Sequence, residues 1–258
     1  PRVSAFRRPP DAFGADPLAI RKRPQMKIAV SGKGGVGKTA VTAALSLLAA
    51  RRARHVLAID ADPDANLAAA LGFDAEAAGR IVPIAKQAAL IEERTGAKAG
   101  QYGQIFKINP EVADIADTYA VSRAGVSLLV LGAASRGGGG CACPENVLLR
   151  ALVGDLVLRK DDAVFLDMEA GVEHLGRATA RGVDALLVVV EPSRNAADCA
   201  RRIRRMAKEV GIVNVRLVAN KVTTPDDRTF CAEALPETEL IACIPYADSI
   251  RRCDRNGA

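Results

Sequence analysis

Residues 27–39 read KIAVSGKGGVGKT, which is a short apolar run followed by a glycine-rich turn and a lysine–threonine pair. Apolar residues recur through residues 38–52, a stretch long enough to form a helix. The segment 32–39 has the glycine and lysine spacing of a phosphate-binding P-loop, and the strand before it and the helix after it supply the context that this pattern needs. The sequence therefore predicts a nucleotide-binding loop rather than an ordinary glycine-rich turn.

Each residue type in this loop has an expected task. Glycines let successive backbone N–H groups curl around phosphate oxygens, and the start of the following helix adds a partial positive charge. Lys38 is expected to reach the β- and γ-phosphates, and the Thr39 hydroxyl is expected to ligate Mg²⁺. ATP or ADP with Mg²⁺ is therefore the expected ligand. The loop residues expected to contact it are Gly32, Lys33, Gly34, Gly35, Val36, Gly37, Lys38, Thr39 and Ala40.

The strand–turn–helix unit recurs along the rest of the chain. Short apolar runs are predicted as strands buried on both faces, and they alternate with helical stretches at 147–158, 173–181 and 196–210. This alternation predicts right-handed crossovers in a doubly wound, mostly parallel α/β sheet flanked by helices. The predicted strands are 27–30, 56–60, 127–132, 163–167, 185–190, 215–220 and 240–245.

Polar side chains close four of these apolar runs, namely Asp60, Asp167, Glu191 and Asn220. Ligands of open α/β sheets bind at the carboxyl ends of the strands, so these four positions are candidates for the nucleotide site. Asp62 lies in the loop after the second run and is a further candidate. An ordinary helix N-cap is the structural alternative for Asp62, and the two roles can coexist.

Residues 1–25 differ from the rest of the chain in charge and pattern. They hold six basic and two acidic residues and show no hydrophobic periodicity, so they carry +4 of the net charge of +6. We interpret them as an unstructured or foreign extension, with a basic interaction arm as the alternative. Residues 26–258 are expected to form a single ATPase domain, with a helical insertion near 74–125 that includes a strand at 104–108.

Composition narrows the class of partner. The charge of +2 left for residues 26–258 makes nucleic acid an unlikely partner. No apolar run reaches the ~18 residues that indicate a transmembrane helix, so no membrane partner is expected. The six cysteines do not form the pattern of a secreted disulfide scaffold, which favours a reducing cytoplasm.

A closely spaced cysteine pair is the second chemical feature of the chain. Residues 137–144 read GGGGCACP, which places Cys141 and Cys143 directly before a predicted helix that starts at Pro144. Thiols near a helix N-terminus have a lowered pKa, which favours metal binding. One pair supplies two ligands, whereas a tetrahedral or square-planar ion takes four, so two copies across a two-fold axis would complete a site. A reactive surface pair and a structural zinc clip are the alternatives. Cys243 lies in an apolar run and is expected in the core.

Taken together, the motifs resemble the CooC-type ATPases, which are nickel-insertion accessory proteins of carbon monoxide dehydrogenase. These belong to the MinD/ParA/nitrogenase-iron-protein class of deviant P-loop NTPases. The resemblance spans about residues 30–250. It rests on GKGGVGKT (32–39), DADPDANL (60–67), GGGGCACPEN (137–146), DMEAGVEHLGRATA (167–180), VEPS (190–193), NKV (220–222) and IPY (244–246).

The resemblance assigns roles to individual residues. Lys33, the second lysine of the loop, would cross to the nucleotide of a partner subunit in an ATP-sandwich dimer. Asp62 would polarise the attacking water, and Asp60 would lie close to the metal. Asp167 would hold Mg²⁺ through water, and Gly171 would sense the γ-phosphate through its N–H. A carboxylate near Mg²⁺ stays ionised and is a weak base, so slow ATP hydrolysis is expected.

The resemblance also implies an adenine pocket, a cargo and partners. Asn220, Lys221 and Pro245 resemble the adenine pocket. The implied partners are a second copy of the chain, joined on ATP or metal binding, and a client metalloenzyme like carbon monoxide dehydrogenase. Ni²⁺ would be held between subunits by Cys141 and Cys143, with Zn²⁺ as an alternative ion. The expected catalytic residues are Lys33, Lys38 and Asp62.

Two other classes of ATPase share most of these motifs. A partitioning or septum-positioning ATPase would also use Lys33, and the arginines of the 196–210 helix could contact DNA phosphate. Solvation of an outer helix face explains the same arginines. An iron–sulfur carrier ATPase would also pair cysteines across a dimer, but with two residues between them, whereas one residue separates Cys141 from Cys143.

Overall fold

The computed structural model describes residues 26–52, 55–99, 101, 103–132, 143–159, 163–172, 175, 177–180, 182–250 and 252. Its centre is an eight-stranded sheet with the order β3-β4-β2-β5-β1-β6-β7-β8. β3 pairs antiparallel with β4, and every other pair in the described sheet is parallel, which confirms the predicted fold class. The strands are β1 (Met26–Gly32), β2 (Val56–Asp60), β3 (Val121–Arg123), β4 (Val126–Val130), β5 (Ala163–Asp167), β6 (Ala185–Val190), β7 (Val215–Val222) and β8 (Leu240–Pro245).

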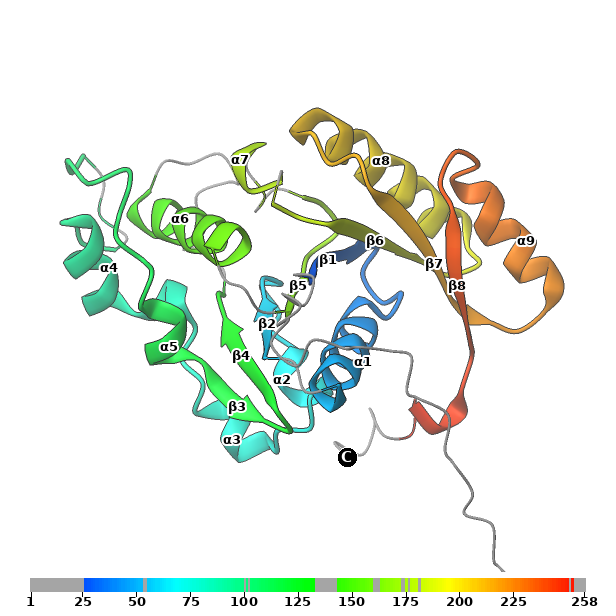
Figure 1. Cartoon of the computed structure of the whole chain (residues 1–258), viewed down its shortest axis with the longest axis horizontal. Helices are drawn as coiled ribbons and strands as arrows, with labels where there is room; N and C mark the ends of the chain where they lie inside the picture. Colours follow the sequence, from blue (N-terminus) through cyan, green and yellow to red (C-terminus); the bar gives the residue numbers. More distant parts are fainter. Residues whose placement is uncertain are drawn as a thin grey trace, which may run out of the picture.

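Helices cover both faces of the sheet (Figure 1). α1 packs against β1, β2 and β5 on one face, whereas α8 and α9 pack against β6 and β7 on the other. None of the helices in the described part of the chain is both long and apolar enough to cross a membrane. The helices are α1 (Lys38–Arg51), α2 (Leu67–Ala70), α3 (Ala75–Gly79), α4 (Ala88–Thr95), α5 (Ile115–Tyr119), α6 (Pro144–Arg159), α7 (Arg177–Ala180), α8 (Arg194–Val210) and α9 (Pro225–Ala234), with a 3₁₀ turn η1 (Ile84–Lys86).

The central strands are buried because helices cover both of their faces. Every residue of β2 and β5 is buried, and so are five of the six residues of β6. Strands of this kind carry nearly continuous apolar runs, which is why the sequence identifies them. Their register places Asp60 beside Asp167, and Val30 on the other side of Asp167. The carboxyl ends of β1, β2 and β5 thus lie side by side, and the loops that follow these strands form the candidate site.

In the insertion one predicted strand is absent, and one strand that was not predicted is present. No strand forms at residues 104–108, where Ile105 and Ile108 are exposed and have no core to face. The strand in this region is β3, which forms a hairpin with β4. Its two-residue turn, Ala124 and Gly125, has positive φ at both positions, as tight hairpins of this length require.

Near the C-terminal end of the described chain, one prediction needs correction and one helix was not predicted. Cys243 is exposed rather than part of the core, because β8 is an edge strand with most of its residues exposed. The sequence reading also missed α9. A capping box between Thr224 and Asp227, with Pro225 at the first helical position, begins this helix.

Candidate functional site

The predicted P-loop connects β1 to α1 and passes close to its neighbours at two glycines. A Cβ at Gly32 would lie 2.4 Å from the carbonyl oxygen of Val189 in β6, so only glycine allows this approach. Gly37 has φ +95°, and a Cβ there would lie 2.3 Å from Nδ2 of Asn220. Packing against the β6 backbone therefore requires glycine at position 32, and the left-handed backbone conformation favours it at position 37.

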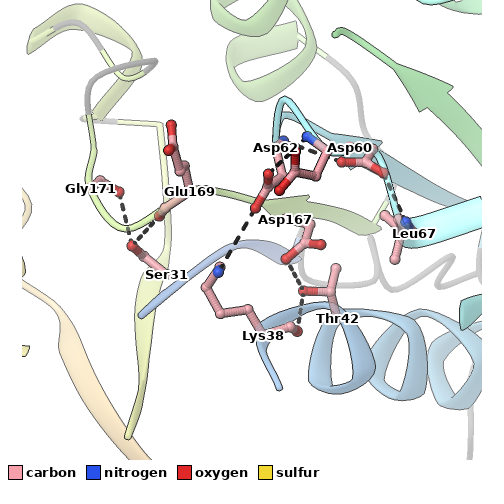
Figure 2. A network of polar contacts seen from close by, with 10 residues as sticks. Ser31, Lys38, Thr42, Asp60, Asp62, Leu67, Asp167, Glu169 and Gly171 are labelled. Atoms are coloured by element: carbon pink, nitrogen blue, oxygen red, sulfur yellow. Dashed lines mark hydrogen bonds and ion pairs between the residues drawn. The ribbon is translucent and has the colours of Figure 1, made fainter. Parts of the chain in front are cut away.

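Asp60 holds the loop that follows β2. Both of its carboxylate oxygens accept backbone N–H groups, from Asp62 at 3.2 Å and from Leu67 at 2.8 Å (Figure 2). Burial raises the pKa of Asp60 to about 7; the Leu67 N–H bond lowers it, and the charge of Asp167 raises it further. Asp60 thus positions Asp62, with both of its own oxygens already engaged.

Asp62 faces the P-loop lysine. Its Oδ2 lies 3.8 Å from Nζ of the buried Lys38, and its Oδ1 accepts the N–H of Asp64 at 3.1 Å. The next helix, α2, has Asn66 rather than Asp62 at its N-cap position. The structure therefore brings Asp62 to the place where Lys38 would meet phosphate, and the alternative of an ordinary helix N-cap is wrong.

Asp167 lies at the end of β5 beside α1. Its Oδ1 accepts a hydrogen bond from the Thr42 hydroxyl at 3.3 Å, a contact that the sequence reading missed. Burial raises the pKa of Asp167 to about 6, while the Thr39 hydroxyl and the Lys38 charge act in the opposite direction. Oδ2 of Asp167 is buried and has no hydrogen-bond partner among the described residues. A buried, unpartnered carboxylate oxygen near a threonine hydroxyl fits the oxygen ligands that Mg²⁺ prefers.

Ser31 connects the end of β1 to the loop after β5. Its buried hydroxyl lies 2.8 Å from the Glu169 carbonyl and 2.9 Å from the Gly171 carbonyl, as Figure 2 shows. The Gly171 N–H, the expected phosphate sensor, donates to the Glu169 carbonyl at 2.7 Å. The sequence reading missed Ser31, although a polar residue at the end of an apolar strand is a signal for such a contact.

Asn220 and Lys221 contact the P-loop backbone. Nδ2 of Asn220 donates to the Val36 carbonyl at 2.7 Å, and Nζ of Lys221 donates to the Gly35 carbonyl at 2.6 Å. Pro245, the third residue of the predicted adenine pocket, ends β8 opposite Val222. The structure thus places two of the three residues against the loop itself, and their contact with adenine stays a prediction.

The cysteine pair lies only partly within the described residues. Cys143 is half-buried directly before α6, and its carbonyl accepts the N–H of Val147 at 3.1 Å, which confirms the predicted helix start at Pro144. Cys141 lies outside the described residues. Within the described part of the chain, no three His, Cys, Asp or Glu side chains come together as a metal site. Metal binding by the cysteine pair therefore stays a prediction.

Comparisons with known proteins agree with this geometry. Residues 27–258 match the family described as the CobQ/CobB/MinD/ParA nucleotide binding domain. The chain is 40% identical to the carbon monoxide dehydrogenase accessory protein CooC of Rhodospirillum rubrum, over 90% of this chain and 88% of that protein. It is 42% identical to an uncharacterized ATP-binding protein of Methanocaldococcus jannaschii, over 87% of each chain.

Solved structures show the same fold at lower sequence identity. MinD in the MinC:MinD cell division complex of Aquifex aeolicus aligns with a TM-score of 0.62 at 20% identity, covering 90% of this chain and 86% of that one. The septum site-determining protein MinD of Pyrococcus horikoshii, solved with Mg-ADP, gives 0.59 at 20% identity, with coverages of 91% and 86%. The chain therefore belongs to the CobQ/CobB/MinD/ParA family of nucleotide-binding domains and, within it, is grouped with the CooC-type proteins.

Proposed function

We propose that this chain is a slow, Mg²⁺-dependent ATPase that dimerises, holds nickel between its subunits and delivers it to an enzyme like carbon monoxide dehydrogenase. One observation carries the ATPase part of the proposal. Lys38 and Asp62 meet at the P-loop, next to the unpartnered oxygen of Asp167. The name of the relative CooC supports the client, and the cysteine pair supports the cargo.

The nucleotide chemistry follows from the position of each side chain. Lys38 would exchange its contact with Asp62 for the β- and γ-phosphates, which leaves Asp62 beside the phosphate to orient a water molecule. Thr39 would hold Mg²⁺ directly and Asp167 would hold it through water. The ion would supply positive charge at the phosphates. Because an ionised carboxylate is a weak base, Asp62 favours slow turnover.

Dimerisation would add a charge that one chain does not supply. Mg-ATP keeps a net negative charge after Lys38 has bound it, and Lys33 is half-buried in the same loop, next to the exposed Gly34. A second copy could present its Lys33 to this phosphate. ATP would then bring two chains together because a cation in the partner stabilises the bound triphosphate.

The same dimer would complete the metal site. Cys141 and Cys143 of two chains provide four thiolates, which suit Ni²⁺ or Zn²⁺. Closure by ATP and loading of the ion would then be coupled, and each would raise the affinity for the other. Hydrolysis would open the dimer, separate the four sulfurs and release the ion to the client in the cytoplasm.

A partitioning ATPase is the second candidate, because MinD and ParA proteins share the fold. Such a protein would use the arginines of α8 to bind DNA. Arg201 forms an ion pair with Asp198 at 2.6 Å, and Arg204 forms one with Glu237 at 3.5 Å. Paired arginines on an exposed helix fit a solvated surface better than a phosphate-binding one. DNA retention that falls steeply with salt would support this candidate instead.

The test is metal analysis of protein purified without oxygen, with and without a non-hydrolysable ATP analogue. The proposal predicts nickel binding that the analogue strengthens, without the visible absorbance of an iron–sulfur cluster. Cluster absorbance after reconstitution with iron and sulfide would favour the iron–sulfur carrier. Protein that binds neither metal nor cluster would contradict both carrier functions.

A further inference from the structure

An ion pair lies behind the P-loop, on the side of its carbonyl groups. Nζ of Lys221 lies 3.0 Å from Oε2 of Glu191 and 2.6 Å from the carbonyl oxygen of Gly35. The other oxygen of Glu191, Oε1, lies 3.5 Å from the hydroxyl of Ser193, the N-cap residue of α8. Glu191 therefore connects the end of β6 and the start of α8 to the lysine that contacts the loop.

The backbone of β7 is distorted where it supplies this lysine. Lys221 has φ +58°, a left-handed conformation that costs free energy for any residue with a Cβ. The pairing of β7 with β8 shifts register between Ala219 and Val222. Successive side chains of a regular strand point to opposite faces, but Asn220 and Lys221 both reach the same loop. The distortion thus aims two consecutive side chains at the P-loop, and a strained backbone at such a place suggests a functional role.

The two contacts orient the N–H groups of the loop. In a trans peptide unit the C=O and the N–H point in opposite directions. Lys221 holds the Gly35 carbonyl, so the Val36 N–H points the other way, to the Lys33 carbonyl at 3.3 Å. Asn220 holds the Val36 carbonyl, so the Gly37 N–H also points away from β7. The first contact closes the turn that carries Lys33, and the second turns an N–H toward the side of the loop that would face phosphate.

We propose that Glu191 is a positioning residue for nucleotide binding, acting through Lys221. An ammonium group on a flexible side chain is strongly hydrated and would otherwise spend part of its time in water. The Glu191 carboxylate, with 23% of its side chain exposed, keeps Lys221 on the Gly35 carbonyl and so preorganises the loop before the nucleotide arrives. The proposal deepens the ATPase function and rests on nucleotide binding at this loop.

The test compares Glu191→Gln with Lys221→Met in calorimetric titrations with Mg-ADP. A charge-assisted hydrogen bond in a partly buried site is worth about tenfold in affinity, so each variant should bind Mg-ADP about tenfold more weakly. The double variant should bind no more weakly than Lys221→Met alone. Both changes remove the same interaction, in which Glu191 holds Lys221 on the Gly35 carbonyl. The KM for ATP should rise by a similar factor, while kcat at saturating ATP stays within about twofold of wild type. The reason is that the contact of Lys221 with the Gly35 carbonyl orders the loop before the nucleotide is bound.

Glu239→Gln is the matched control. It removes an exposed ion pair in which Glu239 Oε2 lies 3.3 Å from Nε of Arg216, a residue of β7 like Lys221, and it should leave Mg-ADP affinity unchanged.

Wild-type affinity in Glu191→Gln, or losses that add in the double variant, would overturn the proposal. If Glu191→Gln does not fold, hydrogen exchange of Lys221→Met decides. The Val36 amide, which donates to the Lys33 carbonyl, should exchange faster than in wild type, and an unchanged rate overturns the proposal. Wild-type affinity in Lys38→Ala would instead refute the nucleotide site itself.

Discussion

The nucleotide end of the sheet and the cysteine end of α6 are built in different ways. At the nucleotide end, side chains from several strands converge on one loop, and Lys38 already has a charged neighbour in Asp62. At the cysteine end, Cys143 lies at the start of one helix, and no metal-binding cluster forms among the described residues. The first site is formed by described residues of one chain, whereas at the second the described residues include only Cys143 of the cysteine pair.

This difference suggests how the two activities are connected. The register of parallel strands places Asp60 beside Asp167 within one chain, so we expect a single chain to bind nucleotide. A two-cysteine site gains affinity only when a second pair comes close. ATP, bound at the preformed site, would then control the metal site by bringing two chains together. The following changes test each half of this comparison and the connection between the halves.

Lys38→Ala should have the largest effect, and it should affect only the nucleotide end. Removing a buried cation that faces phosphate costs about 3 kcal/mol, or about 150-fold in affinity for Mg-ADP. Isothermal titration calorimetry measures this loss, with the exposed Lys86→Ala as the control. Nickel binding without nucleotide should not change. Nickel loss in Lys38→Ala would show that the two ends are not independent.

The double change Cys141→Ser, Cys143→Ser should have the complementary effect. Thiolates bind nickel far more strongly than hydroxyls, so we expect nickel affinity to fall by at least about 100-fold. Affinity for Mg-ADP should stay within about twofold of wild type. Cys243→Ser is the matched control, because Cys243 is exposed on the edge strand β8. Full nickel binding in the double variant, measured by equilibrium dialysis, would exclude the pair as the site.

Lys33→Ala should weaken the connection between the two ends. In the proposed dimer this lysine would act on the nucleotide of the other chain, so Mg-ADP affinity of the single chain should be retained. Loss of one phosphate contact in the dimer should weaken ATP-driven dimerisation by about tenfold. Sedimentation velocity with a non-hydrolysable ATP analogue measures this shift. If the variant dimerises as strongly as wild type, Lys33 does not contact the nucleotide of the partner chain.

The last expected effect concerns folding rather than binding, and it is the pH dependence of the stability of the nucleotide-free protein. Burial raises the pKa of Asp167 from 3.8 to about 6, so the folded chain keeps this proton at a pH where the unfolded chain has lost it. The contribution of Asp167 to the free energy of unfolding must therefore fall as pH rises from about 4 to about 6. Asp167→Asn removes this penalty, and across that range the variant should gain up to about 3 kcal/mol relative to wild type, because one pKa unit corresponds to about 1.4 kcal/mol.

Urea unfolding at a series of pH values measures this gain as the difference between the two proteins. The difference should level off above pH ~6, where Asp167 of the wild type is ionised in both the folded and the unfolded chain. Asp226→Asn, at an exposed position in the first turn of α9, serves as the control. A difference that does not vary with pH would show that burial does not raise the pKa of Asp167.

The buried strands and the P-loop were predictable from sequence because both leave local patterns. Apolar runs mark β2, β5 and β6, and the glycine spacing of the loop is strict. The hairpin strand β3 was not predictable, since it is three residues long and largely exposed. The segment 104–108 reads QIFKI, and its three apolar residues suggest a strand, but Ile105 is 98% exposed.

The contacts within the site were only partly predictable. The strand ends that carry Asp60, Asp167 and Asn220 follow from the α/β pattern. The contact of Ser31 with Glu169 joins residues 138 positions apart, and that of Lys221 with Gly35 joins residues 186 apart. Such contacts depend on the order of strands in the sheet, which local periodicity does not determine. This is why the contacts of Ser31, and those of Lys221 with Glu191 and the Gly35 carbonyl, were found only in the folded structure.

The most direct test of the central claim counts nickel ions and chains in the same complex. Nickel-loaded protein would be separated by size with light-scattering detection, with and without a non-hydrolysable ATP analogue, and its nickel content measured in each peak. The account predicts one nickel ion for every two chains, in a species of twice the chain mass whose share rises with the analogue. One nickel ion per chain in a monomer, unaffected by the analogue, would contradict it.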